Sequence, residues 1–333
     1  IMSRYFVPTF QNISLDHGIQ ALLQPLYEQC RKTLTREASI ASDVRKENIR
    51  AYSEGMTPNS LTFLGLISDG DQGLVTGNNS KYLGVICHSQ ARADEIDTRF
   101  VNILNREGNM DISLEDFHAD RQLYYDMAEQ LKTKRRNPSL FGKFFLYKTV
   151  ADTDVCQYEA LDTDIQKNGA ESDCWIVYNR GNAEGLRWSV PAAEVINWRK
   201  DYVSELRNST KSRWQGEAYY PTTGFGWVDY FTDRLKAFRV AVGPYSKNVI
   251  KMHSFCPLAS DDYITAVLNS DFVANYVKAM ITTTHTLQIN DGRLIPIVIP
   301  TPDQHDEIIH LVSRIKDGED EASVMAELNG KIT

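Results

Sequence analysis

The chain has 333 residues, of which 42% are hydrophobic and 24% are charged, and these ordinary globular values argue against wholesale disorder. No apolar run approaches the roughly 20 residues needed to span a bilayer, so we expect no membrane contact and a cytoplasmic location. The formal net charge of −8 at first sight argues against a nucleic-acid partner.

The cysteines and histidines form no recognisable metal or disulfide pattern. The five cysteines are scattered without a CxxC pair, so we expect reduced structural thiols rather than a disulfide framework or a zinc site. His305 and His310 are five positions apart, whereas a helix aligns two metal ligands at i and i+4. We therefore expect no bound metal.

The first predicted element is a helical segment at residues 14–54, within a spacer that we place at residues 1–58. Its first half carries the apolar stripe of an amphipathic helix, formed by Ile19, Leu22, Leu23, Leu26, Cys30 and Leu34. Ser14 stands where an N-cap belongs. Charged residues dominate the second half, which predicts a solvated helix or a helical spacer.

Residues 59–258 have a different pattern, in which short apolar runs alternate with turn residues. These runs are rich in Val, Ile, Phe and Tyr and predict strands at 61–67, 82–87, 144–150, 174–178 and 238–243. We expect one helical interruption, near 115–133. The pattern predicts a β-rich domain with long connections.

Residues 259–333 are predicted to be a helical C-terminal section. A helix is expected at 261–281, capped by Ser260 or Asp261, followed by a strand at 295–300. A final amphipathic helix contains Ile308, Leu311, Val312 and Ile315 and opens an acidic tail. The whole chain is therefore expected to be α+β, with a helical spacer, a β-rich domain and a helical end.

The charge is distributed unevenly along the chain. Residues 130–150 carry six bases and no acid, namely Lys132, Lys134, Arg135, Arg136, Lys143 and Lys148. Residues 231–251 carry five bases against Asp233, namely Arg234, Lys236, Arg239, Lys247 and Lys251, whereas residues 303–327 carry eight acids against two bases. The acidic tail makes the net charge negative although the chain contains two basic stretches. These stretches are either phosphate-binding surfaces or solvated surface charge.

Two segments imitate the catalytic motifs of an adenine methyltransferase. Residues 221–226, PTTGFG, look like a cofactor loop, and residues 137–140, NPSL, begin like the loop that holds a flipped adenine. Neither follows the buried apolar strand that such loops require, and the second lacks its aromatic residue.

The acids at 162–164 with Lys167 have the composition of a nuclease site but lie in a polar loop. We expect no active site on this chain.

The segment 73–79, GLVTGNN, is predicted to be a tight turn between strands. Gly77 and Asn78 tolerate positive φ, and the side chains of Thr76 and Asn79 can hydrogen-bond nearby backbone. Such a turn offers amides and short polar groups to phosphates or base edges. An ordinary hairpin turn is the alternative.

Four segments in order resemble a known family. GLVTGNNSKYL (73–83), CWIVYNRGNAEGLRWSVPAAEVINW (174–198) and TTGFGWVDYFTDRLKAFRV (222–240) are similar to elements in the target-recognition region of bacterial adenine-N6 DNA methyltransferases and fused type II restriction–modification enzymes. The segment 263–308, with IPIVIPTP near its end, resembles the ending that type I specificity subunits share. The resemblance covers roughly residues 61–310.

The resemblance implies that the chain reads a short sequence in double-stranded DNA and presents an adenine to a catalytic domain. That domain would be an N-terminal methyltransferase domain or subunit, and it would hold S-adenosylmethionine and, where the parent enzyme cleaves DNA, Mg²⁺; no cofactor is expected on this chain. Trp188 is expected in the core. The alternative function is a protein-interaction or regulatory module that keeps the fold without binding DNA. The candidate DNA-contacting residues are Thr76, Gly77, Asn78, Asn79, Lys81, Lys134, Arg135, Arg136, Arg187, Lys211, Arg213 and Arg239.

Overall fold

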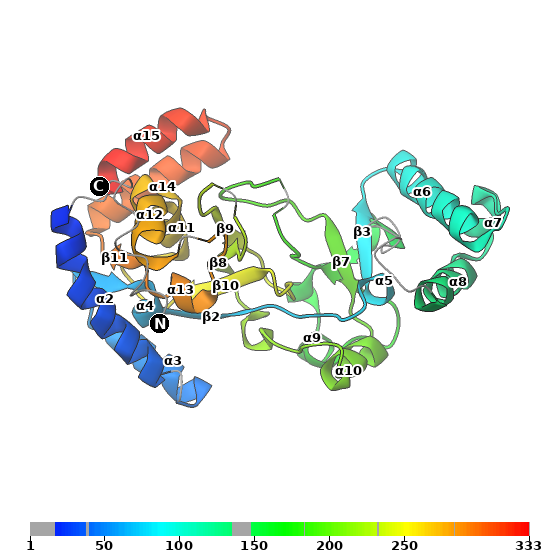
Figure 1. The fold of residues 1–333 in the computed structure, drawn as a ribbon, viewed down its shortest axis with the longest axis horizontal. Coiled ribbons are helices and arrows are strands. Elements are labelled where there is room, and N and C mark those ends of the chain that lie inside the picture. Colours follow the sequence, from blue (N-terminus) through cyan, green and yellow to red (C-terminus); the bar gives the residue numbers. More distant parts are fainter. Residues whose placement is uncertain are drawn as a thin grey trace. The chain divides into compact units, whose positions relative to one another are not determined.

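The first and last helices of the described chain belong to one unit, and the middle of the chain forms another. A computed structural model describes residues 17–37, 40–134, 148–182, 184–231, 233–282 and 284–332. The terminal unit comprises the residues up to Gly73, Arg180–Val190 and the residues from Gln215 onward, and the central unit comprises Leu74–Asn179 and Pro191–Trp214. Helices pack on sheets in both units, so the chain is α+β as predicted (Figure 1).

The predicted helical segment at 14–54 is helical but is two helices rather than one, α2 (His17–Glu37) and α3 (Ser42–Glu54). Only part of the predicted apolar stripe on α2 is buried. Leu23 and Cys30 are buried, whereas Ile19, Leu22 and Leu26 are exposed. The buried part of the stripe packs with Phe63, Tyr276 and Leu294 of the same unit.

The terminal unit is built on an antiparallel sheet in the order β2-β10-β8-β9, with a separate pair β1-β11. These strands are β1 (Leu61–Phe63), β2 (Ser68–Gln72), β8 (Gly224–Val228), β9 (Ala237–Val240), β10 (Val249–Ser254) and β11 (Pro296–Val298). The predicted strand at 61–67 is wrong beyond its third residue, because residues 64–67 form the single helical turn α4 (Leu64–Ile67). The amides of Leu64 and Gly65 donate to the carbonyls of Ile295 and Arg293, which ends the β1-β11 ladder there.

The helices that cover this sheet come from the C-terminal part of the chain. They are the short η6 (Glu217–Tyr219), α11 (Asp261–Asn269), α12 (Asp271–Tyr276), the π-helical η7 (Val277–Ile281), α13 (Ile289–Gly292), α14 (Pro302–Lys316) and α15 (Glu321–Ile332). Ser260 is the predicted cap of α11, since its hydroxyl accepts from the amide of Tyr263 at 3.2 Å. The predicted helix at 261–281 is interrupted at Ser270, which caps α12. α11 packs on β8 and β9, and α14 packs on α11 and α15.

The central unit contains a mixed sheet in the order β4-β3-β7-β6-β5. Its elements are α5 (Asn79–Tyr82), β3 (Leu83–Cys87), α6 (Gln90–Gly108), α7 (Leu114–Ala119), α8 (Arg121–Lys134), β4 (Lys148–Ala151), η4 (Asp152–Asp154), β5 (Val155–Cys156), η5 (Tyr158–Ala160), α9 (Thr163–Asn168), β6 (Trp175–Val177), β7 (Glu194–Asn197) and α10 (Lys200–Asn208). Strands β3 and β6 confirm the predicted runs at 82–87 and 174–178. Helices α6, α7 and α8 lie together (Figure 1). Their apolar side chains form a separate cluster that includes Phe100 and Phe117.

The helices α5, α6, α9 and α10 of the central unit were not predicted, so this part of the chain is less β-rich than expected. α6 buries Ile96, Phe100 and Leu104, which recur every four residues on one face. α10 buries Val203 and Leu206. Both predicted segment boundaries, near residues 58 and 258, fall inside the terminal unit. None of the helices in the described ranges is long and apolar enough to cross a membrane.

Candidate nucleic-acid interface

The predicted turn at Thr76–Asn79 is held against a distant segment of the central unit. Val75 and Arg213 exchange both backbone hydrogen bonds, at 3.0 and 2.9 Å. Gly77 has φ of +69°, and a Cβ built there would lie 2.4 Å from the carbonyl oxygen of Lys211. Only glycine fits this close approach, so the backbone of the turn packs directly on the backbone of residues 211–213.

The turn does not join two strands of one sheet, which corrects the hairpin-like expectation. β2 precedes it and pairs with β10, whereas β3 follows it and pairs with β4 and β7. The hydroxyl of Thr76 donates to the side-chain oxygen of Asn79, and the one-turn helix α5 begins at that residue. The turn is thus closed by a bond between two side chains, whereas the sequence predicted that these side chains bond to backbone.

Two candidate cations lie next to this turn and are exposed. Within the described ranges, neither Lys211 nor Arg213 forms an ion pair. Their segment is anchored by Trp214, whose ring stacks on the buried Trp198 with centroids 5.7 Å apart, and by the hydroxyl of Ser212, which donates to Leu206. We define the turn surface as Gly77, Lys211 and Arg213. It is an exposed, positively charged surface on a rigid support.

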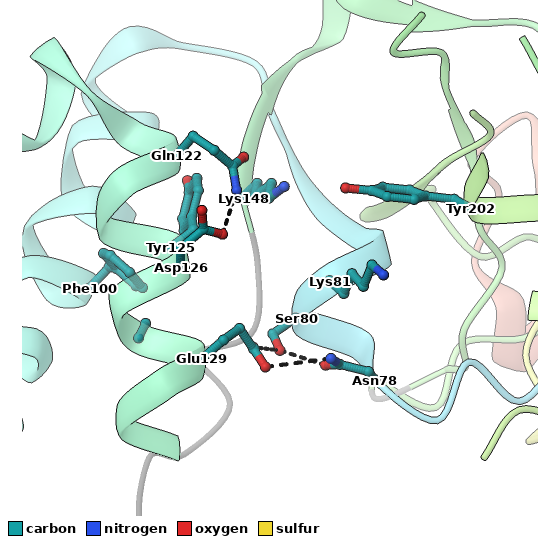
Figure 2. Close-up of a pocket in the computed structure, with 11 residues that line it drawn as sticks. Asn78, Ser80, Lys81, Phe100, Gln122, Tyr125, Asp126, Glu129, Lys148 and Tyr202 are labelled. Carbon is teal, nitrogen blue, oxygen red and sulfur yellow. Dashed lines mark hydrogen bonds between the residues drawn. The ribbon is translucent and has the colours of Figure 1, made fainter. Parts of the chain in front are cut away.

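A pocket of about 280 Å³ in the central unit is lined by three residues of the predicted turn region, Asn78, Ser80 and Lys81 (Figure 2). The carboxylate of Glu129 on α8 accepts from the side chains of Asn78 and Ser80, and the Ser80 hydroxyl also contacts the Asn78 oxygen at 2.8 Å. Both ends of the Asn78 carboxamide are therefore engaged within the protein.

The other residues that line the pocket combine aromatic rings with opposite charges. Tyr125 and Asp126 come from α8, Lys148 from β4 and Tyr202 from α10 (Figure 2). The Lys148 ammonium lies 5.3 Å from the centre of the Tyr125 ring, and burial lowers the pKa of Lys148. Lys81 pairs with Glu205, and its ammonium lies 5.4 Å from the centre of the Tyr202 ring. Cations and carboxylates are thus nearly balanced here.

The first basic stretch, residues 130–150, begins and ends at this pocket. The stretch begins in α8 and ends in β4. Glu129 of α8 and Lys148 of β4 both line the pocket. The candidate side chains of Lys134, Arg135 and Arg136 lie outside the described residues. Two signals that are far apart in the sequence, the polar turn and the ends of the basic stretch, therefore meet in one place.

The second basic stretch has a different environment. It lies in the terminal unit, where Arg239 pairs with Asp261 and with Asp262. Arg234 pairs with Asp271, Lys236 pairs with Asp233, and Lys251 is 1% exposed, with its ammonium donating to the carbonyl of Ala241. Four of its five cations are thus paired or buried, which leaves the exposed Lys247 as the remaining candidate for phosphate contact.

Arg187 and Trp188 share an acidic partner in the terminal unit. The Arg187 guanidinium lies 2.6 Å from Glu321, and the Trp188 indole donates to the same carboxylate at 2.8 Å. Trp188 is 3% exposed and belongs to the main apolar core, which confirms its predicted place. A base contact by Arg187 would require its ion pair to open.

The described residues offer one group of potential metal ligands, Asp94, Asp97 and His118. Asp97 is 2% exposed and accepts from His118 at 2.9 Å and from Arg121 at 2.8 Å. Thr149 also donates to Asp97. Because a guanidinium already neutralises this carboxylate, the group has the chemistry of a structural network that ties α6 to α7, α8 and β4.

The glycines that imitate a cofactor loop do not fit S-adenosylmethionine. Gly224 and Gly226 lie within β8, which pairs with β9 and β10. A Cβ at either position would lie within 2.3 Å of a carbonyl oxygen of β10, so glycine is required by strand packing. At this point of the described chain the backbone continues as a strand and does not turn into a helix. The other imitating segment, 137–140, lies outside the described residues.

Sequence reasoning missed Tyr125, Tyr202 and Glu129 as pocket residues. Tyr125 lies in the helix predicted near 115–133, and no element was predicted around Tyr202. Glu129 is acidic, so a pattern of positive charge does not reveal it. The one available signal was the aromatic pair at 124–125 before a run of bases.

A scan against models of known protein families finds no match to this chain, and a search of curated proteins finds no relative.

Proposed function

We propose that the chain is the target-recognition part of a site-specific adenine-N6 DNA methyltransferase or of a type II restriction–modification enzyme. The observation that carries the proposal is the turn surface, where Lys211 and Arg213 flank the fixed turn at Gly77. Exposed cations on a rigid backbone suit phosphate contacts, which set the register of a protein on a duplex. The sequence resemblance supports the same function.

The hydrogen bonds of the turn assign different tasks to its two asparagines. The Asn78 carboxamide is engaged by Ser80 and Glu129, so we assign it to holding the turn in place. The oxygen of Asn79 accepts from Thr76, which leaves its NH₂ group to donate. A donor of this kind reads acceptors in the major groove, such as N7 or O6 of guanine or O4 of thymine.

Catalysis, in this proposal, takes place on a partner. S-adenosylmethionine would bind an N-terminal methyltransferase domain or subunit, together with Mg²⁺ if the parent enzyme cleaves DNA. Double-stranded DNA and that catalytic partner are the two partners proposed for this chain. A cytoplasmic location follows from a DNA partner in a bacterial cell.

A second candidate function is a protein-interaction or regulatory module. The observation that favours it is the ion pairing of the second basic stretch, where Arg234, Lys236 and Arg239 are matched by acids. The near balance of charge in the pocket at Asn78 agrees with it. A surface of this type binds proteins by local complementarity rather than by a positive field.

Hydrogen–deuterium exchange with and without a duplex of random sequence at low salt separates the two functions. The proposal predicts slower exchange of backbone amides at 74–82 and 209–214 when DNA is added, with no change in α14 and α15. Double-stranded RNA of equal length serves as a matched polyanion. Binding of neither duplex, or protection that leaves both segments unchanged, would support the second function instead.

A further inference from the structure

A second pocket, in the terminal unit, has features that the proposed function does not use. It lies between α2, α3 and α4 and has a volume of about 210 Å³. Arg45 of α3 and Arg293 reach into its lining together with the buried Asp69. Leu34, from α2, and Leu66, from α4, supply an apolar wall.

Arg45 and Arg293 both pair with the carboxylate of Asp69, so these three side chains together carry a net positive charge. Asp69 is 0% exposed and accepts from Arg45 at 3.1 Å, from Arg293 at 2.7 Å and from the Tyr219 hydroxyl at 2.9 Å. The remaining charged residues of the lining, Arg36 and Glu37, pair with each other at 3.6 Å. The charged side chains of the lining therefore carry a net charge of one positive unit.

A donor in this pocket also lacks an acceptor. The Nε of Arg45 is buried and has no hydrogen-bond partner among the residues that the structure describes. A buried guanidinium N–H without an acceptor is unfavourable. Because this atom has no accessible surface, an anion would lie against the exposed part of the Arg45 guanidinium and would supply the missing charge. The side chains of Arg45 and Arg293 remain 21% and 13% exposed, so both can be reached.

We propose that this pocket binds a small carboxylate with an apolar body. The carboxylate lies against the Arg45 guanidinium, whose planar fork matches it, and the apolar body packs on Leu34 and Leu66. This ligand class differs from a DNA phosphate, which would bring a strongly hydrated diester and no apolar group. The inference does not depend on the proposed function.

Calorimetric titration of the full chain with hexanoate, acetate and inorganic phosphate tests this inference. We expect saturable binding of hexanoate at one site, about tenfold or more tighter than acetate, because the added methylenes leave water. Tightest binding by phosphate would overturn the carboxylate assignment. The absence of saturable binding by any of the three would overturn the site.

Two variants and a control locate the binding. Arg45→Gln removes the guanidinium and should weaken hexanoate about tenfold or more. Asn48→Asp adds a negative charge at the exposed rim without touching the Asp69 network, and it should weaken hexanoate even if the first variant folds poorly. Arg50→Gln, on the same helix but against Phe255, should bind as the parent does. Equal affinity in all four proteins would refute the site.

Discussion

Val75 and Arg213 exchange both of their backbone hydrogen bonds across the central unit, although most of that unit separates them in the sequence. This bridge places the polar turn beside two exposed cations. The candidate interface therefore depends on a long-range backbone contact, and local sequence alone could not reveal it.

The first prediction concerns the glycine of the turn. Gly77→Ala should destabilise the chain by about 1–3 kcal/mol, because alanine disfavours positive φ and its Cβ would meet the Lys211 carbonyl. Urea unfolding followed by tryptophan fluorescence measures this loss. Gly181→Ala is the matched control, since its added Cβ meets no atom within 4 Å. Equal stability of the two variants would show that the close approach is absent.

The second prediction concerns the cations of the turn surface. Lys211→Ala with Arg213→Ala should weaken binding to all duplexes alike and flatten the salt dependence by about 0.9 log units per log salt for each lost contact. Binding measured at several salt concentrations gives this slope. Arg106→Ala, an exposed arginine paired with Glu107, should leave it unchanged. An unaltered slope in the double variant would mean that these cations are merely solvated.

The third prediction concerns the buried Asp69. Asp69→Asn should cost about 3–5 kcal/mol of unfolding free energy, because Arg45 and Arg293 lose their counter-charge in the interior. Asp173→Asn, which breaks an exposed pair with Arg199, should cost less than about 1 kcal/mol. Similar small losses in both variants would show that the Asp69 network contributes little.

The fourth prediction concerns Lys251 and pH. Burial, and then the nearby Arg239, lower the pKa of Lys251 to about 7, whereas the pKa of an unfolded lysine is about 10.4. Between these values the unfolded chain binds more protons, so this group makes stability rise with pH. Tyrosines whose pKa is raised in the folded chain make stability fall as pH approaches about 10. The effect of Lys251 on stability is therefore best measured between pH 7.5 and 9.

Lys251→Met should therefore raise stability at pH 7.5 and reduce the slope of unfolding free energy against pH by up to about 1.4 kcal/mol per unit. The carbonyl of Ala241, which loses its donor, belongs to an exposed residue and can bind water. Urea unfolding at four pH values gives the slope. A variant with the parent's slope would contradict the buried, neutral lysine.

The sequence predicted elements best where a local pattern decides the structure. The stripe from Ile19 to Leu34 and the cap at Ser260 were sufficient for their helices, and the apolar runs at 82–87 and 174–178 were sufficient for β3 and β6. The strand predicted through Ile67 was wrong because the backbone groups of Leu64 and Gly65 bond to residues near 294, a contact that no local window contains.

The candidate site was predictable in part. The residues of the turn and the basic stretches are visible as composition, and Gly77 does take positive φ. The pairing of Arg239 with Asp261, and of Arg187 with Glu321, was not predictable, because each acid is remote in the sequence or belongs to a segment assigned to the tail. Charge counted along a sequence overestimates the charge that a folded surface presents.

Selection from a library of randomised duplexes, followed by sequencing of the bound fraction, measures whether the chain reads a DNA sequence. We expect the full chain to enrich one short sequence, bound at least about 10³-fold more tightly than a shuffled duplex at physiological salt. Asn79→Ala should relax the preference at one or more positions of that sequence. A library without an enriched sequence, with equal affinity for all duplexes, would show that the chain does not recognise a DNA target.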